Sequence, residues 1–282
     1  MSAPIHARLP SITAGRISLW AFLGATWFTR VVLGTFARVE VVHRDRMPAD
    51  GPIVLVANHV NQIDPPLVLA YARRRAHPMA KRELFELPLI GWYFWLYGAI
   101  PVRRFSADMG ALRVARGYLR RDDAVLVFPE GTRSRNGQMR PALPGAAMVA
   151  LISRVPVLPV AISGTRDLNP IRLLTGWIRG RRPRLHIEFG EPFELRPTTR
   201  TEENAVATPR VRGTMAGDVR SAEEETDRIM RTIAALLPEE ARGVYAAPRA
   251  GGPPVVARSI RKDSTAGIET NTEASPDAQR RG

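Results

Sequence analysis

The sequence predicts an α/β fold with a mixed, mostly parallel sheet covered by helices. Short runs rich in Val, Ile and Leu alternate with helix-like stretches, and several of these runs are apolar at successive positions. Strands that are apolar on both faces are typical of a sheet with a helical layer on each side. The expected strands are residues 38–43, 52–58, 99–104, 124–130, 157–163 and 184–190.

Two helices are indicated by local signals. Residues 106–121 begin with a serine, carry an acid in the first turn and place Leu112, Ala115 and Leu119 on one face. Arginines gather toward the end of this stretch, as the helix dipole favours. Residues 65–75 open with two prolines, which the first turn of a helix tolerates.

The pattern changes after about residue 197. Residues 198–220 are predicted to be a polar loop, and residues 222–246 an amphipathic helix. The residues expected on the buried side of that helix are Ile229, Ile233, Leu236 and Leu237.

Three regions are therefore expected along the chain. Residues 1–37 form an N-terminal helical segment, and residues 38–245 form the folded domain. Residues 246–282 are rich in Pro, Gly, Ser and Thr without periodicity, which predicts a disordered tail.

The N-terminal segment is predicted to associate with a membrane. The apolar stretch 17–36 approaches the ~20 residues that a membrane-spanning helix needs, but it contains Arg30. An arginine deep in hydrocarbon is costly, so we favour a helix lying in the interface with Trp20 and Trp27 at headgroup depth. A spanning helix and a helix packed on the protein's own core are the alternatives. The start of the chain lacks a secretory signal pattern, and we expect location at the cytoplasmic face of a membrane.

Composition limits the chemistry. The chain has no cysteine, which excludes disulfides, a thiol nucleophile and cysteine-ligated metals. The scattered histidines form no metal-ligand motif, so no metal is expected. The net charge is +14, with lysine only at Lys81 and Lys262, and such a surface attracts phosphate groups of lipids, nucleic acids or small molecules. Genomic base composition accounts for the arginine bias equally well.

A first candidate motif is "NHVNQID", which follows the apolar run 52–57. A histidine at a strand exit with an aspartate five residues later provides an oriented general base, because the carboxylate holds one ring N–H and fixes the tautomer. His59 and Asp64 are the catalytic candidates. Asp64 also lies where a helix N-cap is expected, so a plain capping role is the alternative.

A second motif, "FPEGTRS", follows the apolar run 124–127. Ligands in open α/β sheets bind where the strands end, so both motifs are expected to line one crevice. Arg133 offers a planar fork for phosphate oxygens, and Gly131 allows close approach of backbone N–H groups. A plain ion pair between Glu130 and Arg133 is the alternative interpretation.

These motifs resemble those of the glycerolipid acyltransferases. Asn58, His59 and Asp64 match the family's NHxxxxD block, and residues 128–134 match its FPEGTRS block letter for letter. Residues 80–104 resemble the lysine-bearing segment and the Gly-to-Arg motif after it, and residues 155–160 the late proline motif. The likeness covers roughly residues 39–191 and is greatest to the lysophosphatidic acid acyltransferases, which are 1-acylglycerol-3-phosphate O-acyltransferases.

The resemblance implies transfer of a fatty acyl group from a thioester to the free hydroxyl of 1-acylglycerol-3-phosphate, giving phosphatidic acid. The implied donor is acyl-CoA or acyl carrier protein, used as a co-substrate, and no bound cofactor is implied. His59 is the implied base, oriented by Asp64. The implied substrate-binding residues are Asn58, Lys81, Arg104, Glu130, Gly131, Thr132 and Arg133.

Two departures from the family pattern bear on the acceptor. Arg103 stands where the family often has an acid, and "VNQI" replaces the Ser-Trp often found within the first block. Another lyso-lipid acceptor, such as a lyso-ornithine lipid, is therefore the alternative within the same chemistry. A non-catalytic membrane binder is the alternative of a different class. The arginine clusters lack interleaved aromatics, so no nucleic-acid partner is expected.

Overall fold

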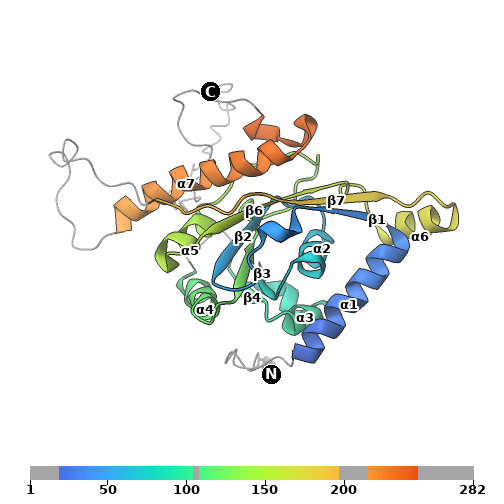
Figure 1. Ribbon diagram of the computed structural model, residues 1–282, viewed down its shortest axis with the longest axis horizontal. Helices are drawn as coiled ribbons and strands as arrows, with labels where there is room; N and C mark the ends of the chain where they lie inside the picture. The colour runs from blue at the N-terminus through green and yellow to red at the C-terminus, as the bar shows by residue number, and fades with distance from the viewer. Residues whose placement is uncertain (1–18, 104–107, 197–214, 247–282) are drawn as a thin grey trace, which may run out of the picture.

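A seven-stranded sheet organises the protein (Figure 1). The computed structural model describes residues 19–103, 108–196 and 215–246. The strand order is β1-β7-β6-β2-β5-β3-β4. The strands are β1 (Arg38–Val42), β2 (Ile53–Ala57), β3 (Ala76–Lys81), β4 (Ile100–Val102), β5 (Ala124–Val127), β6 (Val157–Ser163) and β7 (Arg184–Phe189).

The sheet is mixed and mostly parallel, as the sequence predicted. The pairs β2–β5, β2–β6, β3–β5, β3–β4 and β1–β7 are parallel, and β6–β7 is antiparallel. In the centre, Leu55 of β2 aligns with Leu126 of β5 and Leu158 of β6. Because β2 to β6 run in one direction, the C-terminal ends of these five strands meet at one edge of the sheet.

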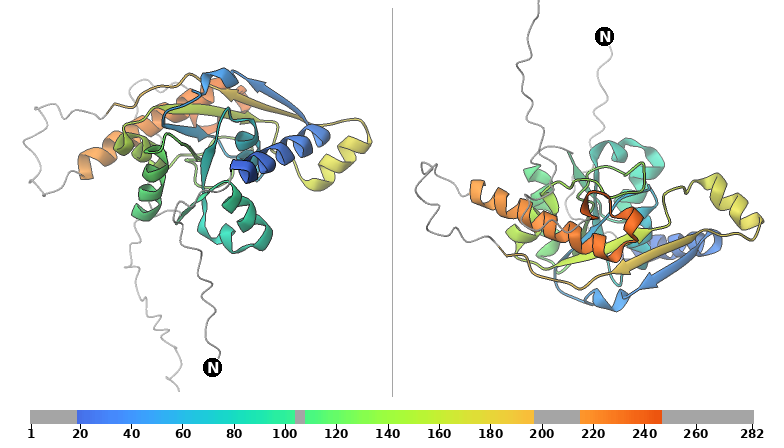
Figure 2. Two further views of the ribbon diagram at one scale, coloured as in Figure 1. Left: turned by 60° about the horizontal axis from the view of Figure 1, so that its bottom comes forward. Right: turned by 90° about the horizontal axis from the view of Figure 1, so that it is seen from above.

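Helices cover both faces of the sheet. They are α1 (Leu19–Phe36), α2 (Asp64–Tyr71), α3 (Pro88–Leu96), α4 (Met109–Leu119), α5 (Gly145–Ser153), α6 (Pro170–Ile178) and α7 (Met215–Leu236). Helices α4, α5 and α7 pack on one face, whereas α1, α2 and the end of α3 pack on the other. Figure 2 shows α7 running lengthwise over its face.

The alternation of strand side chains explains these two layers. Val54 and Val56 of β2 belong to the core beneath α4, α5 and α7, whereas Ile53, Leu55 and Ala57 belong to the opposite core. All five side chains are fully buried. Burial of an aliphatic side chain contributes about 1.5–3 kcal/mol, so this central strand must be apolar on both faces.

The predicted elements agree with the structure in type and differ at their ends. The six expected strands are present, and α4 buries Ala115 and Leu119 while Leu112 is partly buried. The expectation of a polar loop over 198–220 is wrong at its end, since α7 already begins at Met215. The residues expected on the buried side of α7 pack into the core as predicted.

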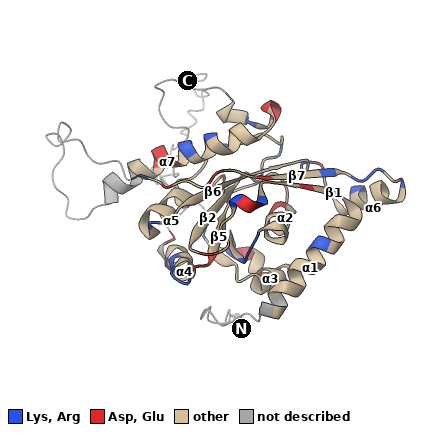
Figure 3. Ribbon diagram, viewed as in Figure 1, with Lys and Arg blue, Asp and Glu red and all other residues tan. Residues whose placement is uncertain are grey.

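Helix α1 has a buried face and an exposed face. Phe22 and Leu33 pack into the core, while Trp20 and Trp27 are 81% and 67% exposed. The Arg30 guanidinium donates to the Ala70 carbonyl in α2, so the one charge of this helix points toward the protein. Figure 3 shows α1 otherwise free of charged residues over its described length. Within the described residues, no helix combines the length and apolarity needed to cross a bilayer.

The tail at 247–282, the first 18 residues and Arg104 lie outside the described residues. The disorder expected of the tail and the role expected of Arg104 therefore stay predictions.

Candidate active site

The two sequence motifs lie together at the C-terminal edge of the sheet. Asn58 and His59 directly follow β2, and Phe128 directly follows the neighbouring strand β5. The Ser134 N–H donates to the His59 carbonyl at 2.8 Å, which joins the motifs through their backbones. The expectation that both motifs line one place in the fold is supported by this contact.

His59 and Asp64 form a buried pair. The His59 Nδ1 lies 3.0 Å from the Asp64 Oδ2, and the two residues are 8% and 0% exposed. A carboxylate can only accept, so Nδ1 carries the proton and Nε2 is the basic nitrogen. The ring of Phe128 lies 4.5 Å from the His59 ring, centroid to centroid, and limits its rotation. This is the geometry of an oriented general base.

Asp64 stabilises the loop between β2 and α2 as well as the histidine. Its Oδ2 also accepts from the Val60 and Asn61 N–H groups, each at 2.6 Å. The expected N-cap role is wrong in detail, since Ile63 is the N-cap and the Asp64 carboxylate turns back to the preceding loop. Three hydrogen bonds therefore converge on this one oxygen and hold the carboxylate in place beside the His59 ring.

Asn58 anchors this loop to the sheet. Its side-chain amide donates to the Ile162 carbonyl at 2.9 Å and accepts from the Ile162 N–H at 2.8 Å. Asn58 is 2% exposed, and both ends of its amide are used in these hydrogen bonds. The substrate-binding role that the family resemblance implied for it stays a prediction.

Glu130 is likewise buried and hydrogen-bonded to the backbone. It is 4% exposed, and its two oxygens accept from the His59 and Arg140 N–H groups, each at 3.0 Å. Burial raises the pKa of the Glu130 carboxyl to about 7, although both backbone hydrogen bonds and Arg140 act to lower it. The alternative of an ion pair between Glu130 and Arg133 is not observed in the described structure.

The remaining predicted residues surround this centre. Gly131 has a φ of 66° and lets the chain turn sharply after Glu130, and Thr132 is partly buried beside it. Arg133 is exposed next to Ser134, and no ion pair holds it within the described parts of the chain. Lys81 lies at the C-terminal end of β3, on the same sheet edge, with its Nζ 3.4 Å from the Glu83 carboxylate.

Two residues near the histidine were missed by sequence reasoning. Phe128 was read only as part of the motif, although its ring packs on His59. The Asn61 side chain donates to the Thr165 and Leu168 carbonyls at 2.8 and 3.0 Å, linking the catalytic loop to the loop after β6. The position of Asn61 inside the departure "VNQI" was the available signal.

The fold and the site define an α/β protein with a buried histidine–carboxylate pair and a basic residue at the same sheet edge. Comparison with known proteins agrees with this class. The family model described as Acyltransferase matches residues 38–163. A 1-acyl-sn-glycerol-3-phosphate acyltransferase alpha from Homo sapiens is 37% identical over 133 residues, which are 46% of this chain and 47% of that protein.

Further relatives extend the match. A 1-acyl-sn-glycerol-3-phosphate acyltransferase from Streptococcus pneumoniae is 29% identical over 168 residues, covering 58% of this chain and 59% of its own. The crystal structure of the 1-acyl-sn-glycerophosphate (LPA) acyltransferase PlsC from Thermotoga maritima aligns with a TM-score of 0.51 and 30% identity. That alignment covers 65% of this chain and 73% of the other. The chain belongs to the acyltransferase family, which confirms the resemblance, and it spans about half the length of the first curated relatives it matches.

Proposed function

We propose that this protein transfers a fatty acyl group from a thioester donor to the free hydroxyl of 1-acylglycerol-3-phosphate, giving phosphatidic acid. The observation that carries the proposal is the buried His59–Asp64 pair, 3.0 Å apart, joined through the His59 carbonyl to the loop that bears Arg133. The printed names of the relatives support the same acceptor.

The proposed reaction needs one proton transfer in each direction. The His59 Nε2 takes the proton from the acceptor hydroxyl, and the hydroxyl oxygen attacks the thioester carbonyl carbon. The carbon–sulfur bond then breaks, and the thiolate leaves with the proton that the imidazolium returns. Asp64 holds the ring in one tautomer and balances its positive charge during the step. No acyl-enzyme forms.

The acceptor phosphate is assigned to Arg133 and Lys81. Both residues lie at the sheet edge that carries His59, and both are accessible to solvent. The planar guanidinium of Arg133 matches phosphate oxygens, and the Lys81 ammonium adds a second positive charge. Lys81 exchanges its exposed Glu83 partner for the phosphate, which costs little because exposed ion pairs are weak.

Membrane association is proposed through the exposed face of α1. The apolar residues of this face are Trp20, Leu23, Trp27, Phe28 and Val31. They belong to a helix whose one charge, Arg30, is turned onto α2. An interfacial helix of this kind suits an enzyme whose acceptor and product are lipids.

A direct assay tests the function. Purified protein is incubated with oleoyl-CoA and a panel of lyso-lipids that includes 1-acylglycerol-3-phosphate and lyso-ornithine lipid, and products are identified by mass spectrometry. We expect phosphatidic acid as the main product. His59→Ala is expected to lower its rate of formation about 100- to 10,000-fold, because the general base is lost.

His186→Ala is the matched control. His186 lies on β7 with a partly buried side chain beside Glu40 and Glu188, outside the candidate site. We expect its rate to stay within about twofold of the wild-type rate, as for most surface substitutions. Transfer at the wild-type rate in His59→Ala contradicts the assignment of the base. Turnover of another lyso-lipid without turnover of 1-acylglycerol-3-phosphate contradicts the acceptor.

A further inference from the structure

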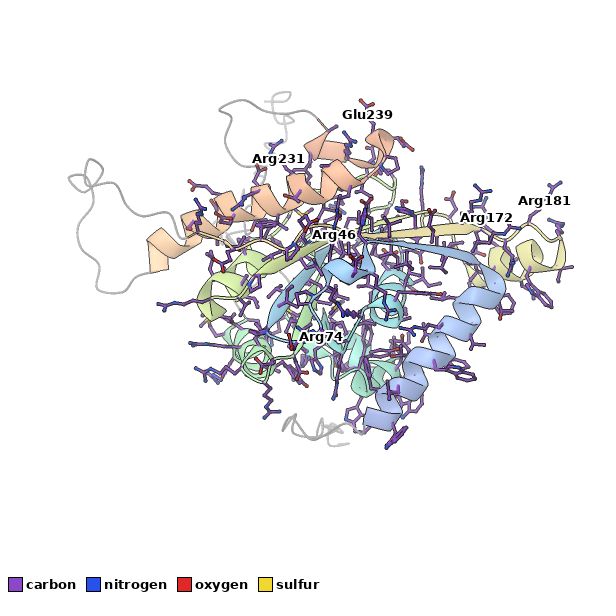
Figure 4. All side chains as sticks on the ribbon, viewed as in Figure 1. Arg46, Arg74, Arg172, Arg181, Arg231 and Glu239 are labelled. Carbon is purple, nitrogen blue, oxygen red and sulfur yellow. The ribbon has the colours of Figure 1, made fainter. Side chains whose placement is uncertain are left out.

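A C-terminal strap packs against the loop that follows the FPEGTRS motif. The strap comprises residues 238–246, which follow α7 and include two short 3₁₀ helices, η4 (Glu239–Ala241) and η5 (Gly243–Tyr245). Figure 4 labels Glu239 near the start of the strap, beyond the last turn of α7, with its side chain pointing outward. The family model matches residues 38–163 and does not include the strap, and the function proposed above uses none of its residues.

The strap is hydrogen-bonded to a bridging segment, residues 139–143. The Met139 N–H donates to the Ala241 carbonyl at 2.9 Å. The Ala142 N–H donates to the Tyr245 hydroxyl at 3.2 Å. Two backbone groups of the bridging segment are therefore held from the C-terminal side.

Two other N–H groups of the bridging segment bind the motif loop. Arg140 donates to a Glu130 oxygen at 3.0 Å, and Leu143 donates to the Pro129 carbonyl at 2.7 Å. The second Glu130 oxygen accepts from the His59 N–H at 3.0 Å. One buried carboxylate thus joins the bridging segment to the residue assigned as the base.

The contact between the strap and the bridging segment is close and buried. Gly243 has a φ of 53°, and a Cβ added there would collide with the Met139 carbonyl oxygen, so only glycine permits this approach. Tyr245 and Ala142 are 4% and 0% exposed and belong to the same core as Met139. Because a buried N–H that loses its acceptor is costly, the Tyr245 hydroxyl restrains the position of Ala142.

We propose that Tyr245 is a positioning residue for acyl transfer, which acts on His59 through the bridging segment and Glu130. The inference rests on the proposed function and deepens it by extending the site to the strap. Tyr245 holds Ala142 in place, and with it the nearby Arg140 N–H that binds Glu130. The carboxylate then stays where it accepts from the His59 N–H. Small displacements of a catalytic group slow the reaction itself, so the effect belongs to kcat.

The test begins with Tyr245→Phe, which removes the hydroxyl and keeps the ring in the core. Initial rates with oleoyl-CoA and 1-acylglycerol-3-phosphate give kcat and both KM values. We expect kcat to fall about tenfold and both KM values to stay within about twofold, because positioning is weakened and binding is not. Tyr118→Phe on α4 is the matched control, since it also removes a buried tyrosine hydroxyl from this core. Its kcat is expected to stay within about twofold of the wild-type value.

Two further measurements distinguish positioning from a loss of stability. Glu130→Gln can keep only one of the two hydrogen bonds of the carboxylate, so it interrupts the path from Tyr245 to His59. Adding Tyr245→Phe to this variant is expected to lower kcat by no more than about twofold, because coupled residues have non-additive effects. Hydrogen exchange followed by mass spectrometry is expected to quicken in Tyr245→Phe at the amides of Arg140 and His59 and to stay unchanged in β5.

An unchanged kcat in Tyr245→Phe overturns the proposal, as does an equal loss in Tyr118→Phe or a full further loss in the Glu130→Gln background. Faster exchange throughout the sheet overturns it too, since that result indicates a general loss of stability. A wild-type protein that forms no phosphatidic acid refutes the proposed function, and exchange then still tests the strap. Faster exchange confined to the His59 and Arg140 amides supports the link from Tyr245, and unchanged exchange there refutes it. The two failures are thus distinguishable.

Discussion

In the candidate site, one side chain is proposed to react and several others are hydrogen-bonded to the backbone around it. His59 is the residue assigned to touch the acceptor hydroxyl, whereas Asn58, Asp64 and Glu130 use their oxygens on backbone groups around it. A buried polar atom is costly unless it is hydrogen-bonded, and these bonds keep the loop in one conformation. Most of the polar residues in the two motifs therefore stabilise the conformation of the loop that carries His59.

The raised pKa of Glu130 predicts how the stability of the protein changes with pH. Its pKa is raised from an ordinary value of 4.5 to about 7, so the folded state holds this proton more tightly than the unfolded state. The stability contributed by the protonated form is therefore present at low pH and lost as the pH rises through about 7. Because glutamine cannot ionise, we expect the stability of Glu130→Gln not to show this decrease as the pH rises through about 7.

Urea unfolding of both proteins at about pH 5 and about pH 8 measures the effect. The wild-type free energy of unfolding, relative to that of Glu130→Gln, is expected to fall by about 2–3 kcal/mol between the two conditions. Because glutamine keeps one carbonyl acceptor for the His59 N–H, the variant should fold. A relative stability that does not change with pH, or that rises with pH, contradicts the raised pKa.

At the scale of elements, the central strands could be predicted and others could not. β2 and β5 are short runs of fully or almost fully buried aliphatic residues, and continuous apolar runs of this length are typical of strands covered on both faces. β3 was missed because its sequence, "AHPMAK", contains a proline and a histidine. The proline forms part of a strand bordered by β5 and β4, and His77 is buried by stacking on Tyr118 at 3.6 Å. Those contacts come from distant parts of the chain.

The candidate site shows the same division. The closeness of His59 and Asp64 follows from their spacing, and the meeting of the two motifs follows from parallel strands that end at one edge. The use of Asn58 and Glu130 by backbone groups depends on Ile162 and Arg140, which the motifs do not contain. Helix α6 was not expected from the sequence. Four of its apolar residues are exposed and do not pack into a core, so the helix lacks the buried apolar face by which a helix is usually predicted.

The exposed face of α1 gives a prediction at this scale. The double variant Trp20→Ser/Trp27→Ser removes two of its largest apolar side chains, which are mostly exposed and contribute little to the core. We expect its partition coefficient on lipid vesicles to fall at least about tenfold, measured by co-flotation, with thermal stability close to wild type. Met109→Ser on α4, which is 52% exposed, is the control and should bind vesicles as the wild type does. Undiminished flotation of the double variant contradicts docking through α1.

For the whole molecule, charge and apolar area provide two separate routes to a membrane. The net charge of +14 attracts anionic headgroups over a range set by ionic strength, whereas insertion of the α1 face depends on apolar area. Arginines also lie on the flank of α6, and α1 contacts α6 through the rings of Phe36 and Trp177 at 5.8 Å. The apolar face and the basic flank are thus neighbouring parts of one surface region.

The salt dependence of vesicle binding distinguishes the contribution of net charge from that of apolar area. We expect binding of the wild-type protein to vesicles with anionic lipid to weaken at least about tenfold between roughly 0.05 and 0.5 M salt, because the Debye length shortens severalfold over this range. Binding to neutral vesicles should change little, since it rests on the apolar face alone. In Trp20→Ser/Trp27→Ser, the binding to anionic vesicles that persists at low salt should vanish at high salt, because no second contribution is left. Equal binding of the wild type to neutral and anionic vesicles at low salt would show that the net charge takes no part in membrane association.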